Sequence, residues 1–236
     1  MKSKDQRLLE EAYCSIYESV EEPLYFGPQE HKQKWMEWLD AHSLNLKINQ
    51  DGTINAKGSV DLDGEILLSD PFKSLFPLEA LPFQFKTVEK DFDCRHNNLS
   101  NLKGSPETVG GSFLCYHNSI ELLEGAPKIV QGSFLCYDNR FTSLQGCPEV
   151  IGGKFDCSYS KITSLEGGPK IVHGDFDCTQ TKLVSLDGCP ELIKGEFICD
   201  QFSDEDYRAA ANRIKRQKER DETLSQDFDI DVLKDF

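Results

Sequence analysis

The dominant hydrophobic pattern is a set of columns that recur every 21 residues through the middle of the chain. Each repeat opens with a Phe-x-Cys motif, and the Cys residues are Cys94, Cys115, Cys136, Cys157, Cys178 and Cys199. Because strand side chains alternate between faces, the Phe and the Cys of one motif point to the same side. One coil cannot bury this face alone, whereas stacked coils can. The period therefore predicts a leucine-rich-like solenoid with parallel strands.

Polar and small residues follow each motif where the chain has to turn. Asn97, Asn118 and Asn139 stand three residues after their Cys, where an amide can bond backbone groups that have left the strand. Ser160 and Thr181 take this place in later coils, so we expect the ladder to weaken there. Two Gly columns and one Pro column then predict the corners of the coil, since Gly allows positive φ and Pro fixes φ.

The segments before the regular repeats are expected to close the N-terminal end of the stack. Asp51-Gly52 between two apolar runs predicts a β-hairpin. Two irregular coils are expected after it, one carried by Gly58-Ser59-Val60-Asp61-Leu62 and one by Leu78, Leu81 and Val88. The sequence thus predicts an α+β fold with four parts: a helical segment (1–43), a hairpin cap with degenerate rungs (44–90), the solenoid (91–202) and a C-terminal helix with an acidic tail (203–236).

Helical periodicity appears at both ends of the chain. One helix is expected over about residues 4–20, and a second is expected to start near Pro28 and to dock through its two Trp residues. This segment either packs on the cap or forms a separate interaction module. A third helix is expected from Ser203, capped with Asp206, to about residue 222. Its basic run favours a solvated face over a nucleic-acid site: Arg213, Lys215, Arg216, Lys218 and Arg220.

The last residues alternate between apolar and acidic side chains. This pattern predicts either a strand that pairs with a sheet edge or a short motif that docks on a partner, with a frayed tail as the alternative. The docking residues would be Phe228, Ile230, Val232 and Phe236.

Composition narrows the possible functions. The chain has 236 residues and a formal net charge of −15, which disfavours direct binding to nucleic acid. No apolar run is long enough to span a membrane, and the segment MKSKDQRLLEEAY is not typical of a secretory signal. We therefore expect a cytoplasmic protein whose nine Cys residues are free thiols.

Catalytic and metal-binding motifs are not evident. The Cys ladder lacks the short C-x-x-C spacing of zinc sites, and buried Cys behaves as a small hydrophobe, so we expect core packing. His96 and His117 share one column and could titrate together or bind a ligand, although exposed turn positions are the default interpretation. We predict no catalytic residues, no metal, no cofactor and no enzymatic activity.

The positions that flank each inward Phe and Cys should face solvent. On two adjacent coils these positions are Leu114, Tyr116, Leu135 and Tyr137. Charged residues flank this square: Asp93, Arg95, Asp156 and Asp177. An apolar centre with a charged rim is typical of a protein interface, and solenoids bind on this sheet. Alternatively, the chain's own tail or N-terminal helices cover the square.

The repeat F-x-C-x-x-N-x-L-x-S-L resembles the core of leucine-rich repeats. More narrowly, the chain is similar to leucine-rich-repeat proteins of tailed bacteriophages over about residues 44–200. The matching segments are 51–54 (DGTI), 60–62 (VDL), 91–94 (DFDC) and 164–167 (SLEG), while Lys90 replaces the usual Gly before the first FDC.

The resemblance implies a phage-encoded, non-catalytic protein in the host cytoplasm that binds and modulates or inhibits a bacterial host protein such as a defence factor. Two alternatives remain, a component of the virion or its assembly, and an acidic mimic that inhibits a nucleic-acid-binding protein. A small homo-oligomer is compatible with each of these functions.

Overall fold

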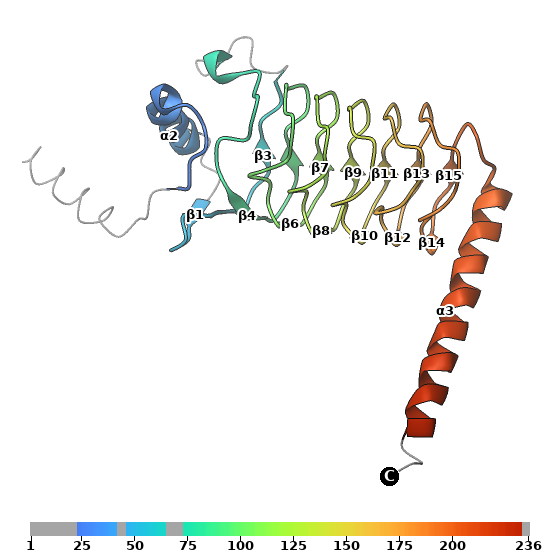
Figure 1. Ribbon diagram of the computed structural model, residues 1–236. Coiled ribbons are helices and arrows are strands. Elements are labelled where there is room, and N and C mark those ends of the chain that lie inside the picture. The colour runs from blue at the N-terminus through green and yellow to red at the C-terminus, as the bar shows by residue number, and fades with distance from the viewer. Residues whose placement is uncertain (1–22, 42–45, 65–72, 233–236) are drawn as a thin grey trace, which may run out of the picture.

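The computed structural model describes residues 23–41, 46–64 and 73–232 and shows a parallel β-solenoid with helices at its two ends (Figure 1). The helix expected over residues 4–20 and the terminal residue Phe236 lie outside this range. None of the helices within it is both long and apolar enough to cross a membrane.

Each coil contributes one short strand to each of two sheets. The front sheet has seven strands in the order β15-β13-β11-β9-β7-β5-β3. Its strands are β3 (Val60–Asp61), β5 (Phe92–Asp93), β7 (Phe113–Leu114), β9 (Phe134–Leu135), β11 (Phe155–Asp156), β13 (Phe176–Asp177) and β15 (Phe197–Ile198).

The back sheet has eight strands in the order β1-β2-β4-β6-β8-β10-β12-β14. Its strands are β1 (Leu46–Ile48), β2 (Ile54–Ala56), β4 (Phe85–Val88), β6 (Thr108–Val109), β8 (Ile129–Val130), β10 (Val150–Ile151), β12 (Ile171–Val172) and β14 (Leu192–Ile193). Only β1 is antiparallel to its neighbour among these described strands.

The Phe and Cys columns fill the space between the two sheets. From Phe92 to Phe176 every Phe of the repeat is fully buried, and so is every Cys from Cys94 to Cys178. Rings of neighbouring coils are in contact, with centroids 5.3 Å apart for Phe113 and Phe134. The predicted inward placement of these columns is therefore confirmed.

The N-terminal end is closed by the predicted hairpin and by a helix. Strands β1 and β2 pair antiparallel around Asp51-Gly52, and β2 then pairs with β4 in parallel. Strand β3 joins the front sheet with Val60 opposite Phe92, which confirms the irregular early coil. Short 3-10 turns, η1 (Gln29–His31) and η3 (Lys73–Leu75), flank these elements.

Helix α2 (Lys32–Ala41) packs on the N-terminal end of the core rather than standing apart. Trp35 and Trp38 are buried. The Trp35 ring lies edge-on to Phe76 and Phe83, with centroids 5.6 and 6.0 Å away. This placement makes α2 a lid on the first irregular coil.

The C-terminal end is closed by helix α3 (Asp204–Val232), which leaves the stack and projects away from it (Figure 1). The predicted capping box forms, because the Asp206 N–H donates to Ser203 Oγ at 3.2 Å and the Ser203 N–H donates to Asp206 Oδ2 at 2.9 Å. Tyr207 stacks on Phe197 with centroids 5.1 Å apart and covers the last coil.

Helix α3 is longer than the sequence predicted. It ends at Val232 rather than near residue 222, so Phe228, Ile230 and Val232 are helical and the strand, one of the three alternatives for this segment, is wrong. Once a helix has started, each added residue gains one backbone hydrogen bond, and this outweighs a short alternating pattern.

The Asn column bonds backbone groups at the turn, as predicted, and in addition it ties each coil to the preceding one. Asn118 Oδ1 accepts from the Leu99 N–H at 3.0 Å, and its Nδ2 donates to the carbonyls of Cys94 and Cys115 at 3.0 and 3.2 Å. In the later coils, the Ser160 and Thr181 hydroxyls donate one bond each, to the carbonyls of Cys157 and Cys178. The ladder is thus weaker there, because a hydroxyl cannot reach both coils.

Glycine is required in the two Gly columns for different physical reasons. The column Gly104, Gly125, Gly146, Gly167 and Gly188 has positive φ, between 77° and 98°, as predicted for corners. The second column does not share this conformation. A Cβ on Gly132 would lie 2.6 Å from the carbonyl carbon of Gly111, so this column is small because successive coils approach closely.

Candidate functional site

The predicted apolar square lies on the outer face of the front sheet. Leu114 and Leu135 are paired across β7 and β9 and are half-buried. The rings of Tyr116 and Tyr137 stack with centroids 4.3 Å apart and an interplanar angle of 12°. These four residues are called the apolar patch below. Tyr116 is only 8% exposed, less than expected, yet it belongs to the outer face because its ring is covered by neighbouring outward side chains.

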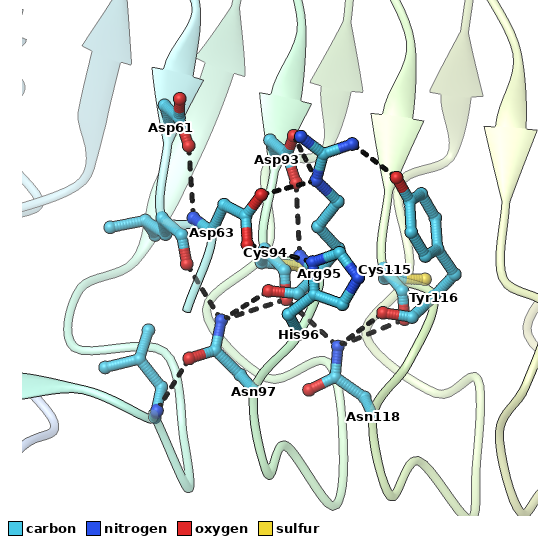
Figure 2. A network of polar contacts seen from close by, with 12 residues as sticks. Asp61, Asp63, Asp93, Cys94, Arg95, His96, Asn97, Cys115, Tyr116 and Asn118 are labelled. Atoms are coloured by element: carbon cyan, nitrogen blue, oxygen red, sulfur yellow. Dashed lines mark hydrogen bonds and ion pairs between the residues drawn. The ribbon is translucent and has the colours of Figure 1, made fainter. Parts of the chain in front are cut away.

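Arg95 fixes one edge of the apolar patch (Figure 2). Its guanidinium donates to the Tyr116 hydroxyl and, through Nε, to Asp63 Oδ2 at 2.6 Å. The Asp93 carboxylate lies 3.3 Å from the same nitrogen. The hydrogen bond to Tyr116 and the nearby carboxylates raise the pKa of Arg95. This edge therefore carries a cation that is already paired with two acids.

The Asp93 carboxyl at this edge has a raised pKa. Burial raises the pKa of its carboxyl to about 6, and the nearby Asp61 and Asp63 act in the same direction, while Arg95 opposes them. The folded protein thus binds this proton more tightly than the unfolded chain, in which an aspartate titrates near pH 3.9. The stability that this group contributes is present below about pH 4 and is lost as the pH rises through about 6.

We predict that Asp93→Asn removes this loss. The difference in the free energy of unfolding between this variant and the unsubstituted protein should grow, in favour of the variant, by about 3 kcal/mol from about pH 4 to pH 8. Chemical denaturation over that pH range measures the difference. Glu121→Gln removes one exposed carboxylate elsewhere and controls for net charge. A variant that is less stable than the parent at pH 8 would show that the Arg95 ion pair outweighs the desolvation of Asp93.

The opposite edge of the apolar patch also pairs a cation with two acids. Lys154 Nζ lies 2.9 Å from Asp156 Oδ2 and 3.0 Å from Asp177 Oδ2. Burial alone would raise the pKa of Asp177, but hydrogen bonds from Lys154 and Thr179 outweigh it and hold that pKa below its ordinary value. Both charged edges are therefore internally compensated.

The two histidines of the predicted column are stacked beside the apolar patch. The His96 and His117 rings have centroids 4.9 Å apart, and each also lies edge-on to Tyr116, at 5.4 and 5.3 Å. His96 Nδ1 lies 3.0 Å from Asp63, and His117 Nδ1 lies 2.6 Å from Asp138. Both residues have positive φ, 53° and 51°, so they occupy the turn predicted from the sequence, where His117 is exposed and His96 is half-buried. They widen the aromatic surface.

The buried Cys column is not arranged for covalent or metal chemistry. Burial raises the pKa of the Cys94, Cys115, Cys136 and Cys157 thiols well above the ordinary range. A protonated, buried thiol is a poor nucleophile and a poor metal ligand. Over the residues that the structure describes, no group of three or more His, Cys, Asp or Glu side chains is placed to hold a metal ion.

The structure places all eight predicted binding residues on one face, although Tyr116, Asp93 and Asp156 are buried there rather than exposed, and it adds one residue that the sequence pattern did not predict. Asp63 belongs to the irregular coil, and the pairing of β3 with β5 brings it beside Arg95. The sequence similarity between residues 58–62 and 111–115 could have predicted this contact, because it aligns Asp63 with the column of Arg95 and Tyr116. No family model, curated protein or solved structure matches this chain.

Proposed function

We propose that this chain is a non-catalytic module that binds another protein through the apolar patch on the front sheet. The supporting observation is the contiguous surface of two paired Leu residues and two stacked Tyr residues, bordered on both sides by charged clusters. Tyr is enriched where interfaces gain most of their energy, because it buries a large rigid ring and keeps a polar tip. Tyr137 would make this contact, since the Tyr116 ring beneath it is already covered. A rim of polar groups around such a centre excludes water in the complex.

The resemblance to leucine-rich-repeat proteins of tailed bacteriophages supports a further proposal about the partner. A phage-encoded protein of this kind would bind and modulate or inhibit a protein of the bacterial host, such as a defence factor, in the host cytoplasm. This step rests on family context, because a fold alone does not specify a function.

The charged edges argue against acidic mimicry of a nucleic acid. A mimic presents free carboxylates, whereas Asp63 and Asp93 are paired with Arg95, and Asp156 and Asp177 are paired with Lys154. Binding through the apolar patch should therefore depend weakly on salt, whereas binding by mimicry should depend strongly on it.

The proposal predicts that Leu114→Asp combined with Leu135→Asp abolishes capture of the partner from host lysate. Two charges at the centre of the interface would be desolvated without partners, which should weaken binding by at least about a hundredfold. Since both side chains are half-buried and lie outside the core, the variant should remain folded, with a lower melting temperature because the new carboxylates lie beside Asp93 and Asp156. Capture with identification by mass spectrometry, repeated at low and high salt, measures both effects.

Leu122→Asp is the control for a leucine-to-aspartate change outside the patch, because Leu122 is 60% exposed and lies on another side of the coil. It should leave capture unchanged. Equal capture by the double variant and the parent protein would show that the apolar patch is not the binding surface. Loss of capture at high salt with the unsubstituted protein would favour the acidic mimic.

A further inference from the structure

The back sheet carries a second apolar surface, which lies on its outward side. The outward residues of β8, β10, β12 and β14 are all aliphatic: Ile129, Val150, Ile171 and Leu192. Three of them are 51%, 45% and 44% exposed, namely Ile129, Val150 and Leu192. Parallel pairing aligns the four side chains in one column, here called the aliphatic stripe. A contiguous exposed aliphatic stripe is typical of an interaction site.

A column of alternating charge runs beside the aliphatic stripe. In the sequence, a charged residue directly precedes each residue of the aliphatic stripe, and the charged column extends one coil further toward the N-terminus. Its members are Glu107, Lys128, Glu149, Lys170 and Glu191. Neighbours in the column form exposed ion pairs, at 3.8 Å for Lys128 with Glu107 and 2.8 Å for Lys170 with Glu149. The sign of the charge thus changes at each step along the solenoid.

This arrangement is complementary to itself. Consider a twofold axis that lies in the plane of contact, runs along the strands and passes between Val150 and Ile171. The axis reverses the order of the coils and leaves each column facing the same column of the second copy. Val150 then faces Ile171, and Glu149 faces Lys170 of the other copy. The outer positions match as well, since Ile129 faces Leu192 and Lys128 faces Glu191.

We infer that the aliphatic stripe is the interface of a homodimer, in which two copies of this chain pack back sheet to back sheet with antiparallel solenoid axes. The twofold axis passes through the centre of the aliphatic stripe. In the charged column beside it, the same axis places an acidic residue of one copy opposite a basic residue of the other in every pair. The next column supports the same fit, because a hollow beside Val150 is lined by Gly152 and His173, and these two positions face each other across the axis.

The apolar patch on the front sheet lacks this property. A twofold axis between its two coils would place Asp93 opposite Asp156, which are both acidic, so the charges that border this patch do not invert about its centre. The two surfaces are on different sheets, and the dimer leaves both apolar patches accessible. The inference therefore stands apart from the proposed function.

Sedimentation velocity over a concentration series tests the inference on the full chain. The unsubstituted protein should be dimeric, and Val150→Asp should be monomeric at concentrations where the parent is dimeric, because it buries an unpaired charge at the centre of the interface. Val184→Asp is the matched control, since Val184 is 78% exposed and lies outside the aliphatic stripe. A parent protein that stays monomeric, or a Val150→Asp variant that stays dimeric, would overturn the inference.

A charge exchange provides a second test that leaves the apolar residues unchanged. Glu149→Lys alone and Lys170→Glu alone each place like charges opposite one another twice, so each should raise the dimer dissociation constant by at least about tenfold. An equimolar mixture of the two variants should recover the parent affinity, because in a mixed dimer the copy with Glu149→Lys is basic at both positions and the copy with Lys170→Glu is acidic at both. Failure of the mixture to associate more tightly than either variant would exclude this arrangement.

Discussion

Replacing Phe134 with alanine should lower the free energy of unfolding by about 4 kcal/mol. The ring is fully buried between those of Phe113 and Phe155, at centroid distances of 5.3 and 5.8 Å. The coils on either side cannot close the resulting cavity, because backbone hydrogen bonds fix their spacing. One such bond joins the Phe134 N–H to the Lys154 carbonyl at 2.9 Å. Equilibrium denaturation in urea measures the change.

Leu135→Ala is the internal control for this experiment. Leu135 is the next residue on the same strand, but it points to the outer face and is half-buried. Its truncation should cost about 1 kcal/mol, since it removes less buried surface and leaves no enclosed cavity. Equal costs at the two positions would contradict the assignment of inner and outer faces.

Replacing Asn139 with alanine should lower the free energy of unfolding by about 3 kcal/mol. The side chain is buried, and its Oδ1 accepts from the Ile120 N–H at 3.0 Å. Its Nδ2 donates to the carbonyls of Cys115 and Cys136, both at 3.0 Å. Alanine leaves these buried backbone groups without the bonds that replaced water. The same denaturation experiment provides the measurement.

The later coils supply a natural comparison for Asn139. Ser160 stands in the same column and donates a single bond, to the Cys157 carbonyl at 2.7 Å. Ser160→Ala should therefore cost only about 1 kcal/mol, and Asn139→Ser should fall between the two alanine variants. If Asn139→Ala costs no more than Ser160→Ala, the bonds between coils contribute little to stability.

Much of the fold could be predicted because every coil of a solenoid repeats the same local strand and turn structure. The Phe-x-Cys spacing specifies which face of each strand is buried, and the structure reproduces it from Phe92 to Phe176. The Asp51-Gly52 hairpin was also predictable, since Gly52 adopts φ of 76° and the Asp51 carboxylate accepts from the Thr53 N–H at 3.1 Å. Such local signals do not depend on the rest of the chain.

The parts that the sequence did not predict depend on contacts between irregular and regular coils. Asp63 meets Arg95 although the two residues are 32 apart rather than 21, because an insertion lengthens the first coil. The aliphatic stripe was visible as a column next to the inward one, but its exposure follows only from strand pairing. The predicted C-terminal strand was wrong because a local alternating pattern does not reveal whether a helix already extends through it.

The asparagine ladder also gives the stack a direction of growth. The N–H of Leu99 in one coil is bonded by Asn118 of the next, and the same relation joins Ile120 to Asn139. A chain that emerges from the ribosome N-terminus first can therefore finish each coil only after its successor has been synthesised. Folding of the solenoid would therefore lag behind its synthesis by one coil, and the last coil would be completed only after helix α3 has formed and covered it.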